Sequence, residues 1–229
     1  MARSNPRTTV LQRFESACSH PPWHTVQGRI VGTRLARGRR PVAAALRQMG
    51  VHDATHVRLD PHGRNRARWT ALEVRRCRLP LLVQTVGAVG GALPFVLDET
   101  VERRWGRCLS KRGHDRDPRA SRQQRSIATS GLRWLVLTLV ITPPWTRRSW
   151  AVPVLRVLAP TPEVSRRLGR RPKTGPQRAR QIMLVVRRWW PATALTVMGA
   201  HTSSVRALGR AWARHAGRLM APLRLDAAL

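Results

Sequence analysis

The chain has 229 residues, with 43 Lys or Arg against 11 Asp or Glu, so its formal net charge at pH 7 is +32. That self-repulsion favours a polyanionic partner, above all nucleic acid. A hydrophobic content of 42% excludes a disordered basic tail, and three widely spaced cysteines exclude a disulfide scaffold. The cysteines fit a reducing compartment, so we expect a cytoplasmic, DNA-associated protein. Only Lys111 and Lys173 are lysines.

Residues 1–30 contain three prolines and no sustained hydrophobic period, so we expect a weakly ordered N-terminal segment. Residues 31–90 predict a basic helical region that binds DNA. One helix is expected to begin with Pro41 at its first position, to carry Val42, Ala45, Leu46 and Met49 on one face, and to end at Gly50. A second is expected over residues 65–79, with apolar residues on one side and arginines on the other. Four arginines of this region are candidate DNA contacts: Arg39, Arg40, Arg66 and Arg68.

The stretch from Leu79 to Leu97 has 19 residues without a charge, which is long enough for a membrane-spanning helix. Two prolines and three glycines interrupt it, and arginines lie close to both of its ends. We therefore favour the end of a helix, a glycine-rich turn and a short buried strand over a membrane span. The N-terminus also lacks the apolar region of a signal peptide.

From residue 90 onward the pattern changes to strands. Leu93–Leu97 is a short apolar run that ends at two carboxylates. The apolar runs at residues 132–141 and 150–158 predict a hairpin, because the breaker Thr-Pro-Pro separates them. A Pro- and Arg-rich connector then covers residues 159–176.

Helical spacing returns at residues 179–190, and a short apolar strand follows at residues 194–197. A last helix is expected from residue 202 or 203, with Val205, Leu208, Trp212 and Leu219 on its apolar face. A stripe of four candidate DNA contacts lies beside that face: Arg206, Arg210, Arg214 and Arg218. A final run covers residues 223–229. This order predicts an α/β layer with a mixed sheet.

Asp98 and Glu99 are the sharpest feature of the chain, because two adjacent acids among so many arginines are unusual. An ion pair with Arg103 or Arg104 would explain them without any function. The functional alternative is one corner of a divalent-metal site for phosphodiester chemistry, which needs several hard oxygen ligands. Asp98 cannot provide such a site alone.

The residues around this pair resemble a bacterial insertion-sequence transposase of the DDE type, in which a strand ends in Asp-Asp-Thr before a Glu-Arg-Arg stretch. Here Leu93–Thr100 has the sequence LPFVLDET, and Glu102-Arg103-Arg104 follows it. Further matches lie in the same order along the chain, at residues 38–40, 65–69, 116–118, 131–134, 144–145, 150–153, 179–181 and 223–229. The resemblance covers about residue 30 to the end.

The resemblance implies a ribonuclease-H-like fold that cuts and joins DNA at the ends of the element with Mg²⁺ or Mn²⁺. Asp98 would be the first catalytic aspartate and a metal ligand, with Glu99 replacing the second Asp of the triplet. The family's second catalytic Asp follows a strand that ends in Gly, and here Ala200 stands at that position. An Ala offers no oxygen to a metal.

The third acidic residue of such sites lies further downstream than Leu229. The resemblance therefore implies a C-terminally truncated domain over residues 91–229 with impaired chemistry. Its partners would be DNA and either a second copy of the chain or a complementing transposase chain.

Three interpretations stay open from the sequence alone. The chain is a transposase relative whose cut-and-join chemistry is lost or severely weakened, or it is a non-enzymatic DNA- or RNA-binding protein. The third interpretation is a degenerate reading frame that does not fold, because nucleotide bias also produces a preference for Arg over Lys.

Overall fold

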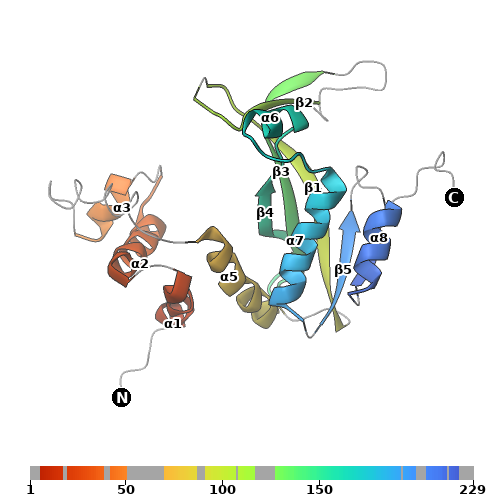
Figure 1. Ribbon diagram of the computed structural model, residues 1–229. Coiled ribbons are helices and arrows are strands. Elements are labelled where there is room, and N and C mark those ends of the chain that lie inside the picture. Colours follow the sequence, from red (N-terminus) through yellow and green to blue (C-terminus); the bar gives the residue numbers. More distant parts are fainter. Residues whose placement is uncertain are drawn as a thin grey trace. The chain divides into compact units, whose positions relative to one another are not determined.

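The computed structural model describes residues 6–17, 20–38, 42–50, 70–86, 91–106, 108–116, 127–191, 193–199, 205–215 and 217–221. The chain divides into two compact units, Met1–Pro80 and Leu81–Leu229 (Figure 1). The boundary falls inside helix α5 (Ala71–Val86), which contains Pro80. The three domains expected from the sequence stay a prediction.

The first unit contains short helices: α1 (Pro6–Gln12), the 3-10 turn η1 (Glu15–Ala17), α2 (His20–Leu35) and α3 (Val42–Gln48). Helix α2 forms where irregular structure was expected, because Pro21 and Pro22 lie in its first turn, the part of a helix that tolerates proline. Helices α2 and α3 pack closely, and a Cβ at Gly32 would overlap the carbonyl group of Ala45. The helix predicted before Gly50 is confirmed over Val42–Gln48, and Pro41, its expected first residue, lies outside the described residues.

Helix α5 begins later and ends later than the helix predicted over residues 65–79, and residues 51–69 lie outside the described part of the chain. The helix ends at Val86, and strand β1 begins at Ala92. The uncharged stretch therefore contains a helix end and the start of a strand, as expected. Among the described residues, no helix has the length and the apolar character that crossing a membrane requires.

The second unit is built on a mixed sheet of six strands: β1 (Ala92–Arg103), β2 (Gly113–Arg116), β3 (Ala128–Ile141), β4 (Trp150–Leu158), β5 (Ala194–Gly199) and β6 (Gly217–Met220). The order across the main path is β2-β3-β1-β5-β6, and β4 also pairs with β3. Strand β3 runs antiparallel to β1, β2 and β4, whereas β5 runs parallel to β1 and β6. The predicted α/β class with a mixed sheet is confirmed, as is the hairpin of β3 and β4.

The sheet has two faces that differ in burial. Leu93, Phe95 and Leu97 alternate with less buried neighbours along β1, because successive side chains of a strand point to opposite faces. Their partners in β3 and β5 are also buried: Leu137, Leu139, Leu195 and Val197. Helix α7 (Gly175–Trp189) contacts β3 and β4 and lies across the sheet (Figure 1). We call this the helix-covered face, and the one that carries Val96 and Asp98 the opposite face.

Two more helices belong to this unit, α6 (Pro162–Arg167) and α8 (Val205–Ala213). The expectation of one last helix through residue 219 was wrong, because α8 ends at Ala213 and Arg218 and Leu219 lie in β6. Leu219 pairs with Val197 across the parallel strands β5 and β6, so this apolar residue is part of the sheet and not of a helix. Glycine is required at residue 217, where β6 begins, because a Cβ there would overlap the indole of Trp212. The final run at 223–229 lies outside the described residues.

Candidate functional site

Asp98 and Glu99 lie in the middle of β1 on opposite faces of the sheet. Asp98 is exposed, and its Oδ1 accepts a hydrogen bond of 2.8 Å from the backbone N–H of Glu99. The Glu99 side chain is 22% exposed, and its Oε1 lies where a Cβ on Gly175 would touch it, at the start of α7. The two side chains therefore do not converge on one ion, because strand geometry separates them.

Glu99 belongs to a cluster of charged residues on the helix-covered face. Nη1 of Arg133 lies 3.8 Å from Oε2 of Glu99 and 3.5 Å from Oδ1 of Asp115, while its Nε donates to the carbonyl of Ala159 at 3.2 Å. Burial raises the pKa of the Asp115 carboxyl, and the charges of Arg133 and His114 oppose that rise. The non-functional alternative of an ion pair thus applies to Glu99, with Arg133 as its partner.

Arg178 of α7 lies beside this cluster and is buried. Its three guanidinium nitrogens donate to backbone carbonyls: Nε to Lys173, Nη1 to Leu158 and Nη2 to Pro160. Burial lowers the pKa of the guanidinium, Arg133 lowers it further, and Glu99 raises it. Arg178 therefore joins the end of β4 to the connector before α7. The sequence pattern leaves Arg178 between the expected connector over residues 159–176 and the helical spacing over residues 179–190, and nothing local indicates which carbonyls it reaches.

The opposite face carries a second polar group at the far end of β1. Glu102 pairs with Arg104 and accepts a hydrogen bond of 2.9 Å from the indole N–H of Trp134, and both donors lower the pKa of its carboxyl. The guanidinium carbon of Arg156 lies 4.3 Å from the centre of the Trp134 ring. Arg104, one of the two expected partners of Asp98 and Glu99, thus pairs with Glu102.

Only part of the metal site that the resemblance implies lies among the described residues. The parallel register of β1 and β5 ends at the pair Leu97–Gly199, one residue before Asp98. Ala200, the position of the missing second Asp, lies outside the described residues. Within the part of the chain that the structure describes, no group of three His, Cys, Asp or Glu could hold a metal ion. The metal role of Asp98 and Glu99 stays a prediction, and we derive no chemical step from it.

The candidate DNA-binding arginines fall into two sets. Four of them, Arg39, Arg40, Arg66 and Arg68, lie outside the described residues. In the other set, Arg206 lies in α8, Arg210 and Arg214 are exposed at the end of α8 and just after it, and Arg218 is exposed in β6. The exposed members are available to a phosphate backbone, although a strand and a helix carry them instead of one helical stripe.

Comparisons with protein-family models, with curated proteins and with solved structures found no match to this chain.

Proposed function

We propose that this chain is a DNA-binding relative of the DDE-type transposases whose cut-and-join chemistry is lost or severely weakened. The observation that carries the proposal is the topology of the sheet around Asp98. Three antiparallel strands, β1, β3 and β4, are followed by β5 and β6, which extend the other edge in parallel through α7 and α8. This order is compatible with a ribonuclease-H-like sheet, with an acid on its central strand.

The charge distribution supports the binding part of the proposal. With a net charge of +32, the chain attracts phosphate backbones before any specific contact forms. The residues near Asp98 support the impaired part, because Glu99 faces away from Asp98 towards Arg133, and the sequence supplies Ala200 after β5. A single exposed carboxylate is a weak ligand for Mg²⁺.

The test is a nicking assay on supercoiled plasmid DNA with Mg²⁺, run on the protein and on Asp98→Ala. We expect both proteins to bind the plasmid and to give the same background of relaxed DNA. Strong Mg²⁺-dependent nicking that Asp98→Ala abolishes would refute the impaired part and would restore an active enzyme. Failure of the unmodified protein to bind DNA would refute the proposal as a whole.

A non-enzymatic nucleic-acid-binding protein is the second candidate, and the exposed Arg210, Arg214 and Arg218 favour it. The two candidates agree on binding and differ in ancestry and in the preferred partner. Equal affinity for double-stranded RNA and DNA would favour the second candidate, because a transposase relative acts on DNA.

A further inference from the structure

A basic pocket of about 530 Å³ lies in the second unit, between the end of β4, helix α6 and the start of α7. Among the described residues, no acidic side chain lines it, and five cationic ones do: Lys111, Arg170, Arg171, Lys173 and Arg178. A neighbouring pocket of about 400 Å³ shares Arg171 and Lys173 with it and adds Arg180. The two pockets therefore form one cationic surface along the first turns of α7, which we call the lysine pocket.

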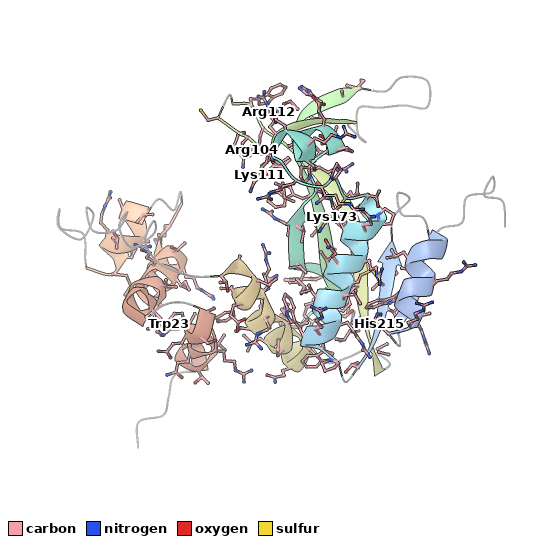
Figure 2. All side chains as sticks on the ribbon, viewed as in Figure 1. Trp23, Arg104, Lys111, Arg112, Lys173 and His215 are labelled. Atoms are coloured by element: carbon pink, nitrogen blue, oxygen red, sulfur yellow. The ribbon has the colours of Figure 1, made fainter. Side chains whose placement is uncertain are left out.

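Both lysines of the chain line this pocket, although 43 residues are Lys or Arg and only two of these are lysine. They come from segments far apart in the sequence, the turn before β2 and the connector before α7, and Figure 2 labels both beside these elements. A lysine ammonium is a compact charge with three rotatable donors, which suits a tetrahedral phosphate held as a point charge. Nucleotide bias towards Arg does not account for two lysines at one place.

The backbone around each lysine is fixed by a buried or bridging arginine. Nη2 of Arg167 donates to the carbonyls on either side of Lys111, those of Ser110 at 3.0 Å and Arg112 at 3.2 Å. Nε of Arg178 donates to the carbonyl of Lys173 at 3.3 Å. Lys173 in turn precedes Thr174, which caps α7 and forms a capping box with Gln177.

In the described part of the chain, no carboxylate competes for the ligand donors of the pocket. Lys111, Arg170 and Arg171 are exposed, and no ion pair joins them to an acid among the described residues. The ammonium of Lys173 donates to a neutral partner, Oε1 of Gln181, at 3.3 Å. Arg178 uses one N–H from each guanidinium nitrogen on carbonyls, so two of its five donors are left for a ligand.

We propose that the lysine pocket binds a phosphate group, and that its source is a phosphodiester of the DNA backbone. Lys111 and Lys173 contact the phosphate oxygens, while Arg167 and Arg178 position the two lysines. The choice of DNA as the source rests on the proposed function, whereas the phosphate chemistry of the pocket does not.

The direct test is acylation of lysine by an amine-reactive ester, followed by mass spectrometry of the peptides. Because the chain has only two lysines, the reaction at Lys111 and Lys173 reports the occupancy of the pocket without interference from arginine. The probes are a 20-base-pair duplex and inorganic phosphate, each compared with potassium chloride at equal ionic strength. We expect the duplex to slow acylation of both lysines by at least about threefold at saturation.

Four outcomes separate the pocket from the proposed function. Protection of both lysines by duplex and phosphate supports the proposal in full. Protection by phosphate alone, in a protein that binds DNA, supports a phosphate pocket and overturns DNA as its source. Protection by neither, in a protein that binds DNA, overturns the pocket and leaves the proposed function standing. Protection by phosphate in a protein that does not bind DNA supports the pocket and refutes the proposed function.

A pair of double variants gives the second readout. Lys111→Ala with Lys173→Ala should reduce the salt slope of DNA binding by about 2 and weaken affinity at least about tenfold near 100 mM salt. The matched control, Arg147→Ala with Arg148→Ala, removes the same charge from exposed positions in the loop between β3 and β4. Equal losses in the two double variants would overturn a specific pocket. Thermal unfolding of both variants should match that of the unmodified protein, because all four side chains are exposed.

Discussion

The two faces of β1 use their residues in different ways. On the helix-covered face, Phe95 and Leu97 are buried and Glu99 joins Arg133 in an ion pair. On the opposite face, Val96 is half-buried and Asp98 is exposed, and within the described part of the chain Asp98 accepts a hydrogen bond only from the backbone N–H of Glu99. This division between the two faces gives the adjacent acids separate roles, because Glu99 stabilises the fold and Asp98 is available to a ligand.

Removal of a buried ring from the helix-covered face should have the largest effect. Phe95 is fully buried, so Phe95→Ala should lower the free energy of unfolding by about 3–5 kcal/mol, because it removes apolar contacts and leaves a cavity. The matched variant on the opposite face, Val96→Ala, should cost about 1 kcal/mol. Chemical denaturation measures both. Equal costs would contradict the division, and a lack of any cooperative transition would support a degenerate chain that does not fold.

Neutralising the two adjacent acids should separate their roles. Glu99→Gln should lower the free energy of unfolding by about 1–2 kcal/mol, because a neutral amide no longer forms the partly buried ion pair with Arg133. Asp98→Asn should change it by less than about 0.5 kcal/mol, because the exposed amide oxygen still accepts the N–H of Glu99. Urea denaturation of the two variants checks this. A larger loss of stability in Asp98→Asn than in Glu99→Gln would show that the acid on the opposite face stabilises the fold, and it would contradict the division.

The smallest expected effect is a pH dependence at Asp115. Burial raises the folded-state pKa of Asp115 above its ordinary value of 3.8, so the folded protein holds this proton more tightly than the unfolded chain. The stabilisation that Asp115 contributes is fully present below the pKa that it has in the unfolded chain. It is lost as the pH rises through the higher pKa that Asp115 has in the folded protein.

Asp115→Asn removes that loss. The free energy of unfolding of the variant minus that of the unmodified protein should therefore increase between about pH 3 and pH 7. Denaturation series at several pH values measure the difference. A difference that falls over this range would show that the attraction of Arg133 for Asp115 outweighs the burial of the carboxyl.

The elements with strong sequence signals were predicted, and several elements without such a signal were not. Long apolar runs identified β3 and β4, and a helical period identified α7, because each buries a full face. Strands β2 and β6 have four residues each, too few for a period, and α6 has six in a connector that looked irregular. Helix α2 was missed because its prolines indicated a break when they instead begin the helix.

The sequence singles out individual residues of the candidate site, whose roles stay predictions, and it does not predict their contacts. The sequence identified Asp98 and Glu99, yet alternation in β1 divides them between two faces, and an assigned strand with its register was needed to show it. The group of Arg133, Asp115 and Arg178 joins three segments distant in sequence. The composition gave one indication of the lysine pocket, because the chain has only two lysines. Only the structure shows that these two lysines line the same pocket.

The dependence of DNA affinity on salt tests the central claim, binding through phosphates, most directly. For a duplex of arbitrary sequence titrated with the intact protein, at least four phosphate contacts should weaken binding about 100-fold or more between 50 and 200 mM salt. A change of less than about threefold over the same range would correspond to a single contact at most and would contradict the account.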